Sequence, residues 1–112
     1  MSAKFKLVFF APSTSTQAIL DHLFLKFPRQ LGNIGLYDQC AFITRGTGQF
    51  RPGPGADPTV GPVGQLGRVE EDRVEIVVND GSKEIVSETI QELKKVHPYD
   101  EVAYDVYKME DF

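Results

Sequence analysis

Four stretches of the chain have the apolar patterning of β-strands. In the first stretch, Phe5, Leu7 and Phe9 occupy every second position, and Pro12 ends the pattern. The third and fourth stretches repeat this two-residue period, whereas the second is a short apolar run. The expected strands cover residues 4–11, 40–44, 73–78 and 102–107.

Two further stretches have the apolar spacing of amphipathic helices. One follows Thr14 and Gln17, which are spaced as a capping box, and Pro28 ends it. The other follows the turn at residues 79–82, which can cap a helix, and it ends before Pro98. Their apolar positions are Ile19, Leu20, Leu23, Phe24 and Phe27, and then Ile85, Val86, Ile90, Leu93 and Val96.

The resulting order, βαββαβ, predicts an α+β, ferredoxin-like fold. We expect a four-stranded antiparallel sheet with both helices on one face and a long loop between the second and third strands. The 112 residues are enough for one domain, residues 1–112, and leave no room for a second core.

The sheet face without helices is expected to carry several apolar side chains. A free monomer usually makes such a face more polar, so a second subunit is expected to cover it. The alternative is that the C-terminal tail, ending in Phe112, folds over the sheet. The apolar residues expected on this face are Val8, Phe10, Ala41, Ile43, Val77, Ala103 and Tyr107.

Composition narrows the range of partners. The formal net charge is −4, which argues against binding nucleic acid through phosphate neutralisation. The single cysteine excludes a disulfide framework. No apolar run has the length of a membrane span, and no secretory leader is evident, so we expect no membrane association and a cytoplasmic location.

Glycine and proline concentrate in one segment, residues 46–68. It holds seven of the 10 glycines and four of the 7 prolines. Such a segment is not expected to form a helix or a central strand. We therefore predict a loop between the second and third strands, and loops of this length are usually functional or disordered.

Two motifs carry a resemblance to a known family. The first begins Gly-Asn-Ile-Gly-Leu-Tyr-Asp-Gln-Cys-Ala-Phe at residues 32–42 and continues through residues 46–52 and the glycine series to Glu71. The second is His-Pro-Tyr-Asp-Glu-Val-Ala-Tyr-Asp-Val-Tyr at residues 97–107. Together they resemble the domain inserted into YqfO-type members of the Nif-three-like dinuclear-metal family, often labelled GTP cyclohydrolase type-two-like.

This resemblance implies a trimer with the fold of the PII signalling proteins and CutA, acting as an accessory lid domain. The metal-binding halves of the family need many His, Asp and Glu ligands, whereas this chain has only His22 and His97. We therefore expect a stand-alone accessory domain that is a binding or regulatory module and not an enzyme, with no catalytic residues.

The glycine- and proline-rich segment is a candidate binding site for a small anionic ligand or a protein partner. Glycines let backbone N–H groups turn toward a phosphate, and this segment carries a net charge of about +1 on an acidic chain. The alternative is a folded-back loop that packs against a neighbouring subunit. The expected ligand-binding residues are Arg45, Gly46, Gly48, Arg51, Arg68 and Tyr99.

The second motif is a candidate metal site, although the sequence requires no cofactor. His97 stands beside Asp100 and Glu101, and Cys40 could add a soft ligand to a divalent metal. The resemblance to CutA, which is associated with divalent copper, favours this hypothesis. The alternative is that His97 caps a helix, Tyr99 packs at an interface and Cys40 is a small buried residue of a strand.

Overall fold

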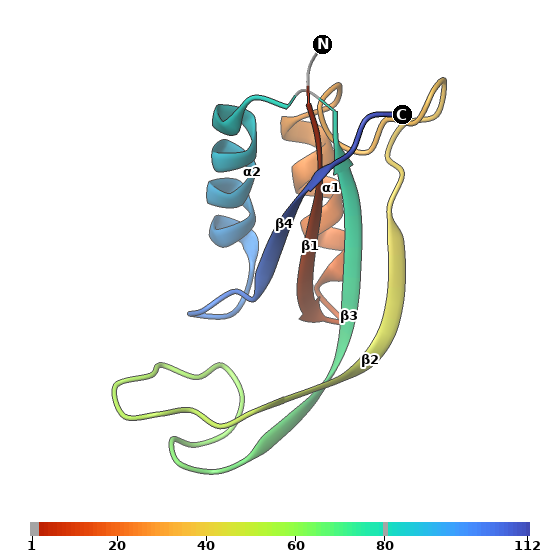
Figure 1. Ribbon diagram of the computed structural model, residues 1–112. Helices are drawn as coiled ribbons and strands as arrows, with labels where there is room; N and C mark the ends of the chain where they lie inside the picture. Colours follow the sequence, from red (N-terminus) through yellow and green to blue (C-terminus); the bar gives the residue numbers. More distant parts are fainter. Residues whose placement is uncertain (1–2, 80) are drawn as a thin grey trace.

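The alternating apolar residues form the four-stranded sheet, and the amphipathic segments form two helices on one of its faces (Figure 1). The computed structural model describes residues 3–79 and 81–112. The elements are β1 (Lys4–Pro12), α1 (Thr16–Lys26), β2 (Phe42–Phe50), β3 (Gly67–Val78), α2 (Lys83–Val96) and β4 (Tyr104–Met109).

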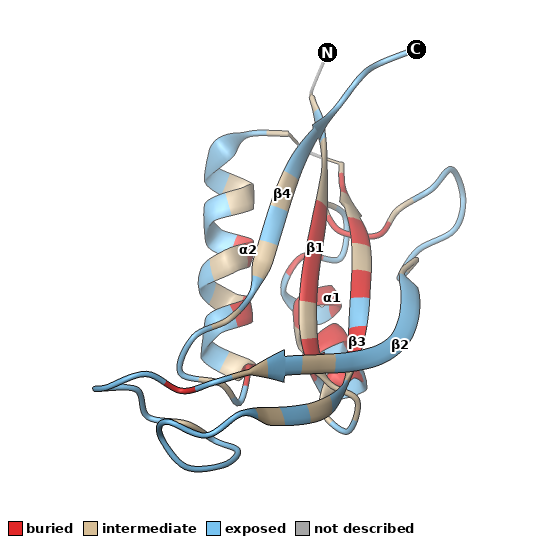
Figure 2. Ribbon diagram, turned by 60° about the horizontal axis from the view of Figure 1, so that its bottom comes forward, coloured by how far each residue is buried: buried red, intermediate tan, exposed pale blue. Residues whose placement is uncertain are grey.

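The strands lie in the order β2-β3-β1-β4, and every neighbouring pair is antiparallel. Both helices pack on one face, where Phe9, Leu23 and Leu93 are fully buried in the core. In Figure 2 the buried positions follow β1, β3 and the inner sides of the helices. The ferredoxin-like fold predicted from the sequence is therefore confirmed.

The side chains of β2 face the opposite sides of the sheet from those expected, because the alternation is shifted by one residue. Ile43 pairs with the buried Val74, so Ile43 and Ala41 lie on the helix-covered face and not on the open one. Phe42 pairs with Glu75 and lies on the open face with 66% of its surface exposed. The expectation was wrong because three consecutive apolar residues carry no polar marker of the strand's phase.

The open face remains uncovered by the chain's own tail. Tyr107 and Met109 of β4 share this face with Phe42 and are 53% and 37% exposed. Phe112 is fully exposed, so the tail does not fold over the sheet. Val8, by contrast, is buried on the open side of β1, between two neighbouring strands.

The glycine-rich segment is more ordered than its composition predicts. The expected loop over residues 46–68 is too long, because β2 continues to Phe50 and β3 begins at Gly67. The loop itself covers residues 51–66. β2 is an edge strand, where glycine is tolerated, and the first proline of this segment, Pro52, comes after β2 has ended.

We call residues 46–71 the arm, because the outer parts of β2 and β3 and their loop project from the body (Figure 1). The arm contributes to a longest dimension of 47 Å, against 25 and 23 Å along the other axes. Within residues 3–79 and 81–112, neither helix is long and apolar enough to cross a membrane.

The two helix starts differ in how well the sequence predicts them. Ser82 caps α2 as expected, since its hydroxyl accepts from the Ile85 N–H at 3.1 Å. Asp80, in the same predicted turn, lies outside the described residues. The capping box predicted for α1 is wrong: Ser15 is the cap residue, and Gln17 donates instead to Asp21 Oδ1 at 2.8 Å.

A buried carboxylate ties the arm to α1. Asp72, which is 2% exposed, accepts from Thr16 Oγ1 at 2.6 Å and from Arg45 Nε at 2.7 Å. The hydrogen bond from Thr16, assisted by Arg45, holds the pKa of Asp72 below its usual 3.8. This carboxylate therefore joins β3, β2 and the first turn of α1 where the arm leaves the body.

Asp72→Asn is expected to lower the urea midpoint at neutral pH and to flatten the acid limb of the stability profile. Because the folded-state pKa is depressed, the carboxylate's contribution is complete above about pH 3.8 and is lost as the pH falls through the folded-state pKa. Urea unfolding at neutral pH and near pH 3 measures both effects. Asp21→Asn on the exposed side of α1 is the control. If wild type and Asp72→Asn lose the same free energy of unfolding between neutral pH and about pH 3, this role of Asp72 is contradicted.

Candidate functional site

The candidate site begins at the end of α2. Pro98 disfavours a helical conformation for the preceding residue, so His97 adopts φ −79° and ψ 138° and ends the helix. Its backbone N–H still donates to Leu93 O at 3.0 Å. The segment of residues 97–101, which we call the corner, then turns toward the arm.

The His97 side chain joins the corner to β1. It is 7% exposed, and its Nε2 lies 2.7 Å from Phe10 O while its Nδ1 lies 3.1 Å from Tyr99 N. A carbonyl only accepts and an amide N–H only donates, so Nε2 must carry the proton and Nδ1 must be the acceptor. Burial lowers the pKa of His97, against the opposing effects of Phe10 O and Glu71.

Tyr99 joins the corner to β3. Its hydroxyl donates to Glu71 Oε2 at 2.9 Å, and its ring centroid lies 4.9 Å from that of His97. Burial, together with the adjacent Glu71 carboxylate, raises the pKa of Tyr99 well above its usual 10.0. Tyr99 is therefore a neutral donor under physiological conditions.

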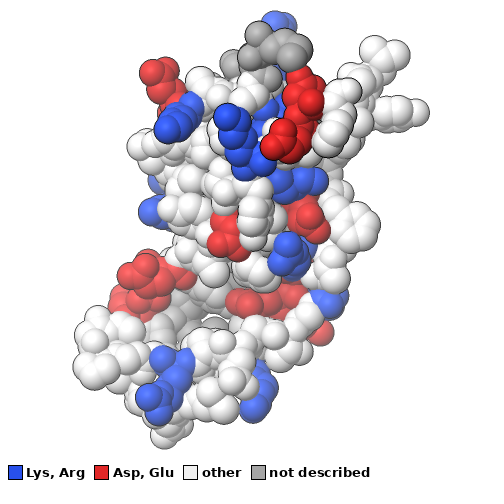
Figure 3. All heavy atoms as spheres, in the orientation of Figure 1, with Lys and Arg blue, Asp and Glu red and all other residues white. Residues whose placement is uncertain are grey.

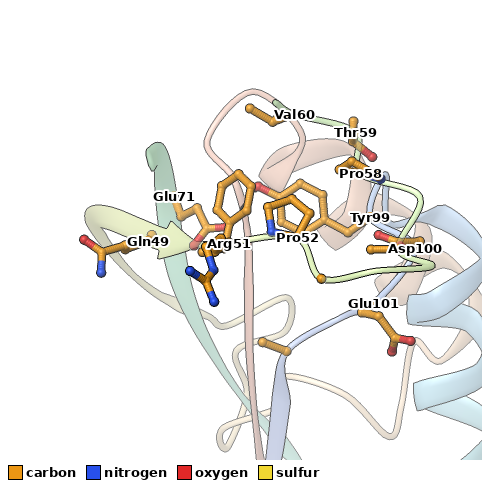
Figure 4. Close-up of a pocket in the computed structure, with 15 residues that line it drawn as sticks. Gln49, Arg51, Pro52, Pro58, Thr59, Val60, Glu71, Tyr99, Asp100 and Glu101 are labelled. Carbon is orange, nitrogen blue, oxygen red and sulfur yellow. Dashed lines mark hydrogen bonds between the residues drawn. The ribbon is translucent and has the colours of Figure 1, made fainter. Parts of the chain in front are cut away.

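The loop of the arm folds back over this corner. Asp57 N donates to Asp100 Oδ2 at 3.0 Å, and Thr59 Oγ1 donates to Pro98 O at 2.8 Å. Within the loop, Gly64 N donates to Pro52 O at 2.8 Å and closes the returning chain. Pro52 of the loop and Tyr99 of the corner both line the space between them (Figure 4).

A pocket of about 380 Å³ lies between the arm and the corner. Its walls are mostly apolar, and its charged lining residues are three acids, Glu71, Asp100 and Glu101, and one cation, Arg51. Figure 3 shows acidic side chains above this hollow and cationic side chains below it. The lining residues are Gly48, Gln49, Phe50, Arg51, Pro52, Gly53, Ala56, Pro58, Thr59, Val60, Glu71, Tyr99, Asp100, Glu101 and Ala103.

The pocket brings together part of the predicted ligand-binding set. Gly48, Arg51 and Tyr99 line it, whereas Arg45, Gly46 and Arg68 do not. Arg45 instead forms ion pairs with Asp72 and Glu70, which compete with any anionic ligand for its guanidinium.

In Figure 4 the Arg51 side chain points away from Tyr99 and Pro58. The three arginines of the predicted anion site therefore do not converge on the pocket.

The predicted metal ligands are not assembled. Both ring nitrogens of His97 already have protein partners. Cys40 lies just before β2, half-buried, with its Sγ 3.7 Å from Asp38 O, so its expected place inside a buried strand is wrong. Among the described residues, no group of three or more His, Cys, Asp and Glu side chains is arranged to hold a metal ion.

Glu71 is the main site residue that the sequence reasoning missed. In the sequence it is only the last residue of the first motif, yet it accepts from the Tyr99 hydroxyl and lines the pocket. The signal available in the sequence was its phase in β3, because Glu71, Arg73 and Glu75 share the open face. Its contact with Tyr99 joins positions 28 residues apart and needs the tertiary fold.

The fold is ferredoxin-like and of the kind seen in CutA and PII proteins. CutA1 from Ehrlichia chaffeensis superposes with a TM-score of 0.66 at 15% identity, over 100% of this chain and 86% of that chain. GlnK of B. subtilis, solved as an ATP complex, gives 0.55 at 19% identity, over 97% of this chain and 84% of that chain. These likenesses concern the fold alone.

Sequence comparison gives a more specific relationship. A GTP cyclohydrolase 1 type 2 homolog of Halalkalibacterium halodurans is 38% identical over 94% of this chain and 27% of that protein. The Bacillus subtilis homolog is 46% identical over 70% of this chain and 20% of that protein. A Bacillus cereus protein related to NIF3 superposes with a TM-score of 0.76 at 34% identity, over 98% of this chain and 26% of that chain.

The chain is therefore homologous, over nearly its whole length, to one segment of the NIF3/YqfO family, and the resemblance seen in its two motifs is confirmed. It spans about a quarter of the length of these relatives. No family model matches the chain.

Gly48→Ala is expected to displace Glu71, because an added Cβ would overlap the Glu71 carboxylate. Tyr99 would then lose its acceptor, and its pKa would fall toward 10.0, which an ultraviolet titration of tyrosine ionisation measures. The overlap is expected to cost about 1–3 kcal/mol of stability.

Gly46→Ala is the matched control on the same face of β2, because its added Cβ meets nothing within 4 Å. Equal effects of the two substitutions on the tyrosine titration would contradict the contact between Glu71 and Tyr99.

Proposed function

We propose that this chain is a non-enzymatic, homo-oligomeric binding module, a trimer, whose ligand occupies the pocket between the arm and the corner. The observation that carries the proposal is the loop folded onto the corner, because it builds a concave, largely apolar site from segments far apart in sequence. The kinship with one segment of the NIF3/YqfO family supports an accessory role beside longer relatives.

The polar groups of the pocket support binding more than catalysis. Its hydroxyl groups are those of Thr59 and Tyr99, and both donate to protein acceptors, Pro98 O and Glu71. A nucleophile needs an adjacent base that accepts its proton. Thr59 donates to a carbonyl, and Tyr99 is held in its neutral form.

The open sheet face supports the oligomer. Phe42, Tyr107 and Met109 together present an apolar surface that no described part of the chain covers. Burying aromatic surface of this kind drives association at about 25 cal/mol per Å². A second copy of the chain supplies a face of the same composition, and in the proposed trimer these faces meet around a threefold axis.

The charge of the pocket favours a ligand that carries a cationic group on an apolar body. Three carboxylates, Glu71, Asp100 and Glu101, line it against the one guanidinium of Arg51. Because opposite charges attract and like charges repel strongly at partly desolvated sites, a phosphate is disfavoured there. The ATP bound by GlnK of B. subtilis makes a nucleotide the natural competing probe.

Wild-type protein is expected to have a solution mass of three times the 12.5 kDa chain mass. Phe42→Ser should weaken assembly at least about 10-fold, because it removes aromatic surface from the interface. Light scattering over a concentration series measures both. Leu25→Ser is the control, since Leu25 is 79% exposed on the opposite, helical side. A monomeric wild type, or dissociation by Leu25→Ser alone, would refute the trimer on this face.

Thermal-shift titration with arginine amide and with ATP tests the ligand class, because a ligand of the folded state raises Tm. We expect stabilisation by arginine amide, about 3–10-fold weaker binding in Glu101→Gln, and no weakening in Arg51→Ala. Glu84→Gln, on the first turn of α2 and outside the pocket, controls for net charge. Stabilisation by ATP that is lost in Arg51→Ala would overturn the cationic ligand in favour of an anionic one.

A further inference from the structure

We propose that protonation of His97 opens the pocket: the imidazole holds the corner and the arm together when neutral and releases them when charged. The inference concerns the regulation of the same site and so rests on the proposed function for its biological meaning. Its physical basis is the hydrogen bonding of one buried ring.

The two ring nitrogens of His97 face partners of opposite kind. Nε2 faces the Phe10 carbonyl at 2.7 Å, and Nδ1 faces the Tyr99 N–H at 3.1 Å. The neutral ring with its proton on Nε2 satisfies both partners. An imidazolium carries N–H groups at both nitrogens, so its Nδ1–H would point directly at the Tyr99 N–H, donor against donor.

Among the described residues, the hydrogen bonds between the loop and the corner lie within three residues of that ring. Thr59 bonds to Pro98 O, and Asp57 bonds to the Asp100 carboxylate. Tyr99 itself ties the corner to Glu71 through its hydroxyl. Protonation leaves the hydrogen bond from Nε2 to Phe10 O in place but removes the acceptor of Tyr99 N, so the turn that carries these three contacts loses the hydrogen bond that fixes its shape.

The charged surroundings of His97 are few. From β3, the Glu71 carboxylate acts on the ring and favours the charged form, but it already accepts from Tyr99 OH. From the corner, Tyr99 contributes a neutral phenol. From β1 and α2, the recorded partners are backbone groups, Phe10 O at the ring and Leu93 O at the His97 N–H.

The direction of the pH dependence follows from burial. Because burial lowers the pKa of His97 in the closed state, an opened corner binds a proton more readily than a closed one. The closed state is therefore fully stabilised above the usual pKa of 6.5 and loses that stability as the pH falls toward the depressed value. The chain has one other histidine, His22, which pairs with Glu92 at 2.9 Å between α1 and α2.

Nuclear magnetic resonance of the imidazole nitrogens tests the proposal directly, in wild type and in His22→Gln. Near neutral to slightly alkaline pH we expect the Nε2–H tautomer of His97 and cross-peaks between Thr59 of the loop and Pro98 of the corner. As the pH falls below 6.5, both proteins should lose these cross-peaks in step with His97 protonation. An Nδ1–H tautomer, or cross-peaks that persist after His97 is protonated, would overturn the proposal.

Two variants separate the switch from general acid instability. His97→Gln should abolish the pH dependence of the cross-peaks below 6.5, because it removes the titrating group. Glu71→Gln keeps an acceptor for Tyr99 and loses the negative charge, so it should shift the opening midpoint to lower pH. An unchanged midpoint in Glu71→Gln, or a pH dependence retained in His97→Gln, contradicts the switch even if one variant folds poorly.

The same experiments keep this inference distinct from the proposed function. If the pocket opens as His97 is protonated but arginine amide does not bind at neutral pH, the switch is supported and the cationic ligand is refuted. Equal binding of arginine amide above and below the His97 transition refutes the switch and leaves the binding module standing. The ligand probe is therefore titrated at both pH values with the wild-type protein.

Discussion

The hydrogen bonds of the His97 ring hold together segments that the chain supplies from its two ends. Phe10 and His97 are 87 residues apart in sequence, and their contact fixes the end of α2 against β1. Burying an imidazole without partners is costly, and here both nitrogens are satisfied by backbone groups. The corner, the arm's loop and the pocket between them all depend on this one arrangement.

The position of β2 at the sheet edge determines the rest of the site. β2 has a neighbour, β3, on one side only, so the glycines at positions 46 and 48 do not interrupt a strand in the middle of the sheet. The outer part of β2 can therefore extend beyond the body as part of the arm. Gly48 also leaves the space that the Glu71 side chain occupies. The same open edge and face leave Phe42 exposed, and the proposed oligomer rests on this surface.

Much of the fold could be predicted from local patterns. The βαββαβ order, the Ser82 cap and the end of α2 before Pro98 each depend on neighbouring residues alone. The phase of β2 could not be predicted, because its apolar start lacks a polar marker and its pairing with β3 decides which side chains face the helices. The predicted limits of the loop were wrong for a related reason, because glycine content alone does not distinguish an edge strand from a loop.

The site was predictable only in part. Gly48, Arg51 and Tyr99 belong to it, as the two sequence motifs suggested. Arg45 lies outside it because its guanidinium donates to the buried Asp72. Glu71 belongs to it because it accepts from the Tyr99 hydroxyl. Both outcomes depend on strand register, which a single sequence does not specify. The contacts of these two residues help to explain why carboxylates outnumber cations in the lining of the pocket.

Amide hydrogen exchange of the wild-type loop is the most direct test of the central claim, that the loop is closed over the corner. At neutral pH we expect protection of the Asp57 amide by Asp100, and of the Gly64 amide by Pro52 O. Gly53 and Val60, exposed in the same loop, should exchange freely. Exchange of Asp57 and Gly64 at the rate of an unstructured peptide would contradict the closed loop and the pocket built on it.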